Sequence, residues 1–361
     1  MLTAIPCTLM RGGTSKGLYF HAADLPGERE LRDCVLLAAM GSPDVRQIDG
    51  VGGAHPLTSK VAVIGRSTHP GADVDYLFLQ VAVDKAEVSD SQNCGNLLAG
   101  VGPWAIESGL VPATAESTSV RIHMVNTGSL AIAHVCTPDG VVEYEGEARI
   151  DGVPGTAAPI ALEFLDVAGS SSGSLLPMGT VTSRCEDIEV TCIDNGMPVI
   201  IVRAADLGVT GAESPAQLES NETLKTIVER LRLALGPRMN LGDVTRKTVP
   251  KVCLVSPPRH GGSIATATFI PHRVHEAIGV LGAVSVATAC VIPGSVAAQV
   301  AQRPAGAGRR VEVEHPSGSF TVDVDVEAGE PIVVRGAALL RTARKLMRGA
   351  VFVPGKLWGR A

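Results

Sequence analysis

Aromatic residues make up only 3% of this 361-residue chain, whereas it contains 40 glycines and 23 prolines. A core with so few rings must be built mainly from valine, alanine, leucine and isoleucine, and the many glycines and prolines indicate frequent tight turns. This composition favours strands over a helical bundle. The length allows two medium-sized domains, each able to bury a core of its own.

Three other absences narrow the class of protein. No run of lysine and arginine is interleaved with aromatic residues, and the formal net charge is −6, so we expect no nucleic-acid partner. The amino terminus has no charged segment ahead of an apolar run, and no uncharged apolar stretch of about 18 residues follows, so we expect neither export nor membrane association. The eight cysteines are scattered without a Cys-x-x-Cys pair, which is typical of a reducing compartment, and we expect a cytoplasmic protein.

The hydrophobic pattern predicts strand, glycine-rich turn, strand and helix, and then the same order again. Strands are expected at residues 17–21, 61–64, 76–83, 120–126, 130–136, 188–193, 199–202, 251–256, 264–269, 310–314 and 320–326. Helices are expected at 30–40, 95–108, 216–235, 283–291 and 338–347. The glycine- and serine-rich segment 168–184 interrupts the pattern, as a linker or as a loop lining a cleft, and separates domains at 1–182 and 183–361. We therefore expect two similar α+β domains facing each other across a cleft.

The segment RGGTSKG at 11–17 is a turn ahead of a strand, with three glycines, two hydroxyls and two cations. Glycines let backbone N–H groups approach a ligand, and Arg11, Thr14 and Ser15 can donate hydrogen bonds to a carboxylate. The segment is not a phosphate-binding P-loop, because no helix opens after its lysine. Two interpretations stay open, an ordinary hairpin turn and an anion site.

Two further positions can carry proton transfer. Lys60 stands directly before the apolar run 61–64. Loss of solvation there favours the neutral amine that a general base requires. A lysine at the end of a strand can instead extend its amine into water. Cys94 precedes the helix expected at 95–108, whose positive end favours a thiolate and whose free N–H groups can hold a carboxylate. A small buried cysteine would give the same pattern.

Other patterns are weaker. The second-half helix start, at 279–285, has no cysteine, which argues against a racemase that uses two thiols. The G-x-G-x-x-A pattern at 100–105 follows a helix start instead of a strand, and Pro103 is expected to kink that helix, so we expect no dinucleotide site. His272 and His275 have no third metal ligand nearby in the sequence, so we expect no metal.

Six motifs, read together and in order, point to a known family. They are MRGGTSKG, DGVGGAHPLTSKVAVI, QNCGNLLAGVGP, CIDNGMPV, PRMNLGDV and EHPSG. They resemble the 2-methylaconitate cis–trans isomerases, and most closely the 4-oxalomesaconate tautomerase branch, which acts in gallate and protocatechuate degradation. The motifs run from residue 10 to residue 318, and the RTARKLMRGAVFVP ending also fits. The resemblance therefore covers nearly the whole chain.

This resemblance implies a diaminopimelate-epimerase-like α+β fold. Two pseudo-symmetric domains would each wrap a β-sheet around a central helix, with the active site between them and the last strand able to return to the first domain. It also implies catalysis without cofactor or metal by a lysine and a cysteine, which fall on Lys60 and Cys94. The partner would be a small unsaturated tricarboxylate, and a homodimer is a possible assembly. The substrate-binding residues would be Arg11, Thr14, Ser15, Ser59, Gly95, Asn96, Arg273, Ser285, Ser317 and Gly318.

We therefore predict an isomerase that acts on 4-oxalomesaconate as a keto–enol tautomerase or a 1,3-allylic isomerase. A methylene group between a 2-keto acid and a vinyl carboxylate is acidic because its anion delocalises into an enolate. Lys60 would remove that proton while N–H groups and cations stabilise the oxyanion. Three alternatives stay open: 2-methylaconitate cis–trans isomerisation, a non-catalytic tricarboxylate-binding protein, and Schiff-base chemistry at Lys60.

Overall fold

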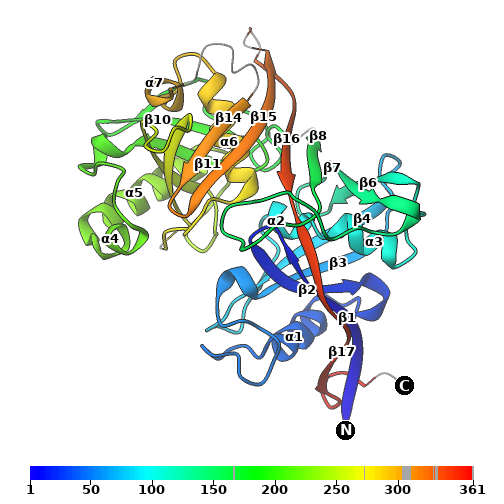
Figure 1. The fold of residues 1–361 in the computed structure, drawn as a ribbon. Helices are drawn as coiled ribbons and strands as arrows, with labels where there is room; N and C mark the ends of the chain where they lie inside the picture. Colours follow the sequence, from blue (N-terminus) through cyan, green and yellow to red (C-terminus); the bar gives the residue numbers. More distant parts are fainter. Residues whose placement is uncertain (166, 272, 303–309, 328, 330–331, 360–361) are drawn as a thin grey trace. The chain divides into compact units, whose positions relative to one another are not determined.

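The computed structural model describes residues 1–165, 167–271, 273–302, 310–327, 329 and 332–359. The chain divides into two compact units, each with its own strands and helices (Figure 1). Unit 1 contains Met1–Leu162 and Arg341–Ala361, and unit 2 contains Glu163–Leu340. The expected boundary at 182/183 lies inside unit 2, because the chain enters this unit already at Glu163. The C-terminal strand belongs to unit 1, the arrangement that the resemblance allowed for.

The glycine- and serine-rich segment 168–184 is part of unit 2 and not a linker between the units. The backbone N–H groups of Ser171 and Ser172, together with the Ser172 hydroxyl, donate to one carboxylate oxygen of Asp194 at 2.8–2.9 Å. These hydrogen bonds hold the segment as a loop against the end of a strand. Composition alone could not reveal this, because glycine and serine serve linkers and ordered loops equally well.

A mixed sheet forms the frame of unit 1. Its strands are β1 (Leu2–Gly12), β2 (Ser15–His21), β3 (Lys60–Arg66), β4 (Val74–Val81), β5 (Val88–Ser89), β6 (Glu116–Met124), β7 (Ser129–Thr137) and β17 (Ala343–Pro354), and β8 (Ile160–Leu165) leads into unit 2. β17, β1 and β2 are antiparallel neighbours. β2 and β3 are parallel, β3 and β4 antiparallel, β4 and β6 parallel, and β6 and β7 antiparallel.

Helices cover both faces of the central strands of unit 1. α1 (Arg29–Met40) begins after Glu28, whose carboxylate accepts two backbone N–H groups, and ends at the left-handed Gly41. Its buried side packs with alternate residues of the strands, which include Leu18, Phe20, Val61, Val63, Leu79 and Val81. α2 (Gly95–Leu98) and α3 (Val101–Glu107) lie on the opposite face, where side chains from β2 and β4 bond to α2.

The single helix expected at 95–108 is in fact two short helices. Gly100 caps α3 and lies against the Tyr19 hydroxyl, so closely that a Cβ at Gly100 would come within 2.4 Å of that oxygen. Pro103 occupies the first turn of α3, where its missing N–H needs no partner. The helix is interrupted at 99–100. Pro103 has no N–H to donate to the Ala99 carbonyl four residues earlier, so the interruption lies where a proline at this position disrupts a helix.

Unit 2 repeats the strand order of unit 1. Its strands are β9 (Ser183–Cys185), β10 (Ile188–Asp194), β11 (Pro198–Arg203), β12 (Lys251–Ser256), β13 (Ile264–Phe269), β14 (Arg310–His315), β15 (Gly318–Glu327) and β16 (Val333–Arg341). β10 and β11 are antiparallel, β11 and β12 parallel, β12 and β13 antiparallel, β13 and β14 parallel, and β14 and β15 antiparallel. This is the order of β1, β2, β3, β4, β6 and β7, so the repeat expected from the sequence is present.

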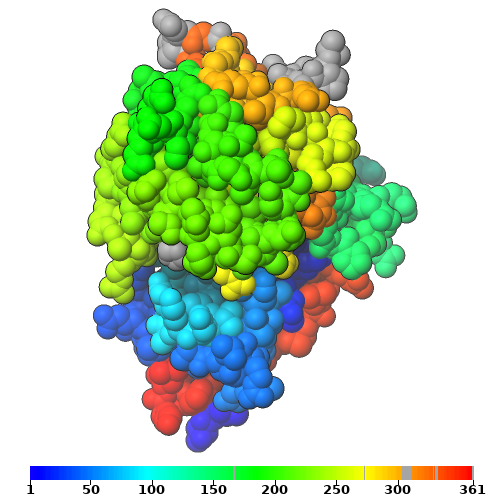
Figure 2. All heavy atoms as spheres, turned by 90° about the vertical axis from the view of Figure 1, so that its left-hand side faces the viewer, coloured from blue at the N-terminus to red at the C-terminus, as the bar shows by residue number. Residues whose placement is uncertain are grey.

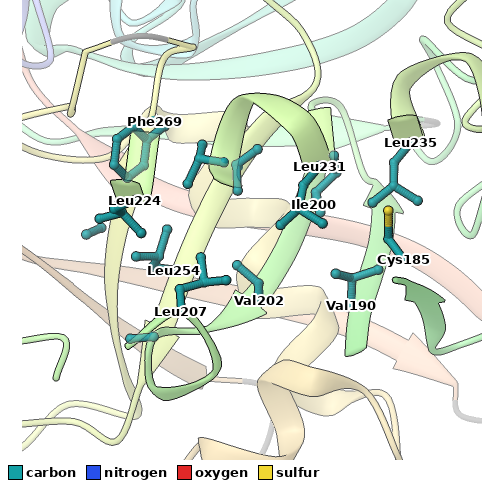
Figure 3. Close-up of a cluster of buried hydrophobic side chains, with 14 of the residues drawn as sticks. Cys185, Val190, Ile200, Val202, Leu207, Leu224, Leu231, Leu235, Leu254 and Phe269 are labelled. Atoms are coloured by element: carbon teal, nitrogen blue, oxygen red, sulfur yellow. The ribbon is translucent and has the colours of Figure 1, made fainter. Parts of the chain in front are cut away.

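The helices of unit 2 are α4 (Pro215–Ser220), α5 (Glu222–Arg238), α6 (Val280–Val291) and α7 (Val296–Val300). Figure 3 shows one core of this unit, where Leu224, Leu231 and Leu235 of α5 meet strand residues including Ile200, Val202, Leu254 and Phe269. In Figure 2 the green and yellow-green spheres, whose colours correspond to the part of the chain that contains α4 and α5, form a continuous outer surface. Among the described helices, none is long and apolar enough to cross a membrane.

The helix expected at 338–347 is wrong. This segment forms the end of β16 and the first part of β17. Alanine, leucine, lysine, arginine and methionine favour a helix locally, but β17 pairs with β1 along almost its whole length. Its Val351 and Val353 enter the core beneath α1, so long-range pairing and burial override the local preference.

Candidate active site

Alternation along β3 and β4 brings the candidate base to the sheet face beneath α2 and α3. Lys60 lies opposite Gln80 in the antiparallel pair, and the next position on that face of β4 is Phe78. Residues two apart on a strand face the same way, so these three side chains share one face. The intervening Val61 and Leu79 point to the other face, into the core beneath α1.

Lys60 is buried, with only 6% of its surface exposed. Its Nζ donates to Gln80 Oε1 at 2.8 Å and lies 5.0 Å from the centroid of the Phe78 ring. In the described part of the chain, Lys60 forms no ion pair with a carboxylate. The side chain therefore does not reach into bulk water, and it is held by one neutral acceptor and one aromatic ring.

Cys94 is half-buried and is the N-cap residue of α2. Two tyrosines from the sheet hold this helix: Tyr76 donates to the Cys94 carbonyl at 3.1 Å, and Tyr19 donates to the Leu97 carbonyl at 2.5 Å. Burial raises the pKa of both tyrosines well above its usual value, and the nearby Cys94 raises it further. Both hydroxyls therefore stay protonated and remain donors, which fixes the position of the cysteine.

The glycine-rich turn between β1 and β2 lies directly against α2. Gly13 has a φ of +51°, and a Cβ there would lie 2.1 Å from Asn96 Oδ1. A Cβ at Gly12 would lie 2.6 Å from the Asn96 carbonyl oxygen. The Thr14 N–H donates to Asn96 Oδ1 at 3.4 Å. The structure thus brings Thr14 next to the start of α2, which also carries Gly95.

Two hydroxyls of this turn are unpaired within the described part of the chain. Thr14 Oγ1 and Ser15 Oγ are buried and form no hydrogen bond with any described residue of the chain. Leaving a buried polar group unsatisfied costs about 1–3 kcal/mol, so two such groups on consecutive residues favour binding of an external partner. A ligand carboxylate is an acceptor for both, which favours the anion-site interpretation of this turn over a plain hairpin.

Arg11 braces the same turn. Its Nη1 donates to the Gly13 carbonyl at 2.9 Å and to the carbonyl and hydroxyl oxygens of Thr342, both at 3.0 Å. Burial lowers the pKa of the guanidinium, and the charge of Arg344 lowers it further. Arg11 therefore shapes the backbone that presents Thr14 and adds positive charge to this part of unit 1.

Ser59 has a different place from the one expected. It is fully buried, and its hydroxyl oxygen lies 2.7 Å from Gln47 Oε1 and 2.9 Å from the His55 carbonyl oxygen, both acceptors within reach of its single proton. Gln47 Oε1 also accepts the Ala54 N–H at 2.8 Å. The Ser59 side chain thus ties together the loop that leads to Lys60.

The expected residues of unit 2 lie in separate places within it. Ser285 is fully buried on α6, where its hydroxyl accepts the Asn195 N–H at 3.1 Å and donates to the Met197 carbonyl at 2.8 Å. Arg273 has a largely exposed side chain paired with Glu219 at 3.0 Å. No hydrogen bond among the residues described here joins Arg273 and Ser285.

Ser317 and Gly318 lie at the turn between β14 and β15, where His315 pairs with Gly318 and Ser317 Oγ lies 3.3 Å from His315 Nδ1. His272, weighed above as a metal ligand, lies outside the described residues. His275 is buried and its Nδ1 accepts the Ala277 N–H at 2.9 Å.

Two residues of the site were missed by sequence reasoning. Gln80 contacts Lys60 only because β3 and β4 pair in one particular register, and nothing in the local sequence marks it. Gln47 is buried in a loop and has a φ of +47°. The local sequence predicts neither its burial nor this backbone conformation. The single available signal was the expected strand at 76–83, whose alternation places position 80 on the same face as Phe78 and Tyr76.

Solved structures share this fold. The crystal structure of a methylitaconate-delta-isomerase matches with a TM-score of 0.83 and 38% identity, covering 100% of this chain and 98% of that chain. A hydroxyproline epimerase from Agrobacterium vitis matches with a TM-score of 0.57 and 15% identity, over 99% and 97% of the two chains, which shows the fold alone. The expected diaminopimelate-epimerase-like α+β fold is confirmed, and the protein is an isomerase of that fold.

The PrpF protein family matches residues 2–354, and the chain belongs to this family. The 4-oxalomesaconate tautomerase of Pseudomonas putida is 60% identical over 357 residues, covering 99% of this chain and 98% of that protein. The (4E)-oxalomesaconate Delta-isomerase of Novosphingobium sp. is 59% identical over 352 residues, with 98% of each covered. The 2-methyl-aconitate isomerase of Shewanella oneidensis is 36% identical over 389 residues, with 97% of each covered. The resemblance drawn from the motifs is confirmed.

Proposed function

We propose that the protein isomerises 4-oxalomesaconate by proton transfer, with Lys60 as the general base. The observation that carries this proposal is the buried amine of Lys60, which contacts an amide and an aromatic ring instead of a carboxylate. The two relatives named for oxalomesaconate, at 60% and 59% identity, support this substrate over the other unsaturated polycarboxylates.

The reaction begins when Lys60, as the neutral amine, removes a proton from the methylene group between the keto acid and the vinyl carboxylate. The electron pair delocalises into a dienolate, and Lys60 becomes an ammonium. Return of a proton to the ketone oxygen gives the enol tautomer, and return to the far allylic carbon gives the double-bond isomer. The net reaction neither consumes nor releases a proton, so no cofactor is needed to balance it.

The turn beside α2 is the proposed carboxylate site. Thr14 and Ser15 offer hydroxyls that no described residue uses, and Arg11 supplies positive charge. Hydrogen-bond donors placed before the reaction starts can stabilise the charge that develops in a transition state. We assign Cys94, at the start of α2, the return of the proton. The resulting thiolate regains a proton from solvent and the Lys60 ammonium releases one to solvent before the next turnover. Arg273, Ser317 and Gly318 remain proposed contacts from unit 2.

A proton NMR time course with 4-oxalomesaconate and 2-methylaconitate side by side tests the substrate. We expect kcat/KM for 4-oxalomesaconate to be at least about a hundredfold higher, a difference of roughly 2.7 kcal/mol in transition-state binding. Comparable rates, or a preference for 2-methylaconitate, would remove the substrate assignment and leave the isomerase class in place.

Two controls address the remaining alternatives. A non-catalytic binding protein would cause no exchange of substrate protons with deuterated solvent, whereas the proposed base must cause it. Borohydride would trap a Schiff base at Lys60 as a stable adduct, and we expect no such adduct.

We also propose a cytoplasmic location, since all eight cysteines, each within the described ranges, are free thiols.

A further inference from the structure

Gln80 makes the one side-chain hydrogen bond that Lys60 Nζ has with the described residues. The two residues face each other across β3 and β4, and the distance from Nζ to Gln80 Oε1 is 2.8 Å. Neither resemblance nor motif assigns a role to this glutamine. Its contact with the proposed base makes it a candidate for a functional residue of unit 1.

The orientation of the Gln80 amide is set by its surroundings. Nε2 lies 3.1 Å from the Pro56 carbonyl, 3.1 Å from the Ser59 carbonyl and 3.3 Å from the Val81 carbonyl. All three neighbours are acceptors, so the NH₂ group must face them and the amide oxygen must face Lys60. The reverse orientation would place an oxygen against three oxygens. The lysine therefore always meets an acceptor at this position.

Within the described ranges, no carboxylate forms an ion pair or a hydrogen bond with Lys60, whose amine bonds to Gln80. Asp75 on β4 is paired with Gly65 at the far end of β3, Asp24 belongs to a 3₁₀ turn next to that same end, and Glu107 forms an ion pair with β17. The titratable groups near the other end include those of Lys16, Tyr19, His55, Tyr76 and Cys94. Asp90, which follows the Ser89 that pairs with Gln80, forms an ion pair with Arg29 at 3.0 Å. Gln80 is thus the acceptor in a position where a buried lysine would commonly have a carboxylate.

We propose that Gln80 is a positioning residue that holds the Lys60 amine through one N–H and aims its lone pair at the substrate without adding negative charge. A neutral acceptor can bond to the amine and to the ammonium alike, whereas a carboxylate at this place would stabilise the ammonium and keep the proton on it. This inference rests on the proposed role of Lys60 as the base.

The test compares Gln80→Glu and Gln80→Met with the wild-type protein. One measurement is the pH profile of kcat/KM for 4-oxalomesaconate. The other is competitive labelling of Lys60 with trace acetic anhydride at each pH, which follows the amine without turnover. Gln217→Glu is the matched control, because it makes the same charge change at a helix cap where Gln217 Oε1 accepts the Ser214 N–H and a carboxylate serves equally. Thermal unfolding shows which variants fold.

For Gln80→Glu we expect the rising limb of the pH profile and the labelling curve to move together toward alkaline pH by about 1–2 units, as an added opposite charge requires. Activity then approaches wild type at high pH. For Gln80→Met we expect kcat to fall about 10–100-fold with KM nearly unchanged, because the amine loses its orientation. Gln217→Glu should change neither curve.

An unmoved labelling curve in folded Gln80→Glu, or wild-type kcat in folded Gln80→Met, would overturn the proposal. If the glutamate variant does not fold, the methionine variant decides. A different result, in which the labelling curve moves but Lys60→Met keeps full turnover, leaves Gln80 as the residue that holds Lys60 and removes Lys60 as the base. The two failures are therefore distinguishable.

Discussion

Lys60 in unit 1 and Lys251 in unit 2 occupy equivalent positions. Each is the first residue of a strand that runs parallel to the second strand of a hairpin, and each is buried, with 6% and 7% of its surface exposed. Their hydrogen bonds differ. Lys60 donates to the side chain of Gln80 on the neighbouring strand, whereas Lys251 donates to the backbone carbonyl of Thr248, a few residues earlier in its own chain segment.

The helix starts differ in the same way. Cys94 is the N-cap of α2 and Gly279 is the N-cap of α6. The N-cap position therefore carries a thiol in unit 1 and no side chain in unit 2. The second residues of the two helices, Asn96 and Leu281, each lie against the glycine of the adjacent hairpin turn. Unit 1 has a polar contact there and unit 2 an apolar one.

Hydroxyl groups complete the contrast. In unit 1, Thr14 Oγ1 and Ser15 Oγ are buried without a partner among the described residues. In unit 2, Ser285 and Thr288 are bonded to Asn195 of the equivalent turn and to backbone carbonyls. The two units therefore share a strand arrangement, but the compared hydroxyls of unit 2 are bonded within it, whereas those of Thr14 and Ser15 are not. Unit 2 also has buried oxygens without a partner among the described residues, Asp194 Oδ1 and Asn195 Oδ1, but these are acceptors and cannot donate to a carboxylate. Buried, unsatisfied groups of this kind are typical of functional sites.

The largest expected effect separates the two lysines. Lys60→Met should lower kcat/KM about 10³-fold because it removes the base, while the chain keeps a side chain of similar shape. Lys251→Met should leave kcat/KM within about threefold, since the Lys251 amine is bonded to a backbone carbonyl of unit 2 and the proposed base lies in unit 1. Steady-state kinetics on folded variants, checked by circular dichroism, measures both. Equal losses in the two variants would mean that buried lysines at this position serve structure in both units.

A smaller effect is expected at the helix starts. Cys94→Ser should lower kcat/KM about 10–100-fold, less than the lysine variant, because serine is a favoured N-cap residue and can relay a proton through water. Gly279→Ala should have no measurable effect, because its φ is −67° and a Cβ there meets nothing within 4 Å. Single-turnover measurements would show whether proton return has slowed. A complete loss in Cys94→Ser with intact binding would make the thiol essential.

The smallest expected effect on catalysis is that of Thr14→Val, and the equivalent comparison in unit 2, Thr288→Val, should change stability instead of catalysis. Thr14→Val should raise KM about tenfold without lowering the melting temperature, because the lost hydroxyl has no partner in the described chain. Thr288→Val should do the reverse and lower the free energy of unfolding by about 1–3 kcal/mol, because it leaves the Asn195 amide unsatisfied. Calorimetry and kinetics on the pair test this. A stability loss in Thr14→Val would show that its hydroxyl already serves the fold.

The sequence predicted elements well where local pattern and burial agree. The expected strands at 251–256 and 264–269 are β12 and β13 residue for residue, because each is a fully buried apolar run between turns. β1 was not expected, since Pro6 interrupts its pattern and its partners lie at both ends of the chain. The helix expected at 338–347 failed for the same reason, because the pairing that forms β17 is not local.

The candidate site divides in the same manner. Lys60, Cys94 and the turn at 11–17 stood out because strand ends, helix starts and glycine-rich turns are local signals. Gln80 could not be found, since its contact with Lys60 depends on the register of two strands. The internal partner of Ser59 was hidden for a similar reason, because Gln47 meets it only when the loop has folded.

Exchange of the substrate methylene protons in deuterated water is the most direct test of the claim that unit 1 carries proton removal. Proton NMR follows this exchange for 4-oxalomesaconate with wild-type protein, Lys60→Met, Lys251→Met and Cys94→Ser. We expect exchange with the wild-type, Lys251→Met and Cys94→Ser proteins, and none above the uncatalysed rate with Lys60→Met. Exchange at the wild-type rate in folded Lys60→Met, or its loss in folded Lys251→Met, would contradict the account.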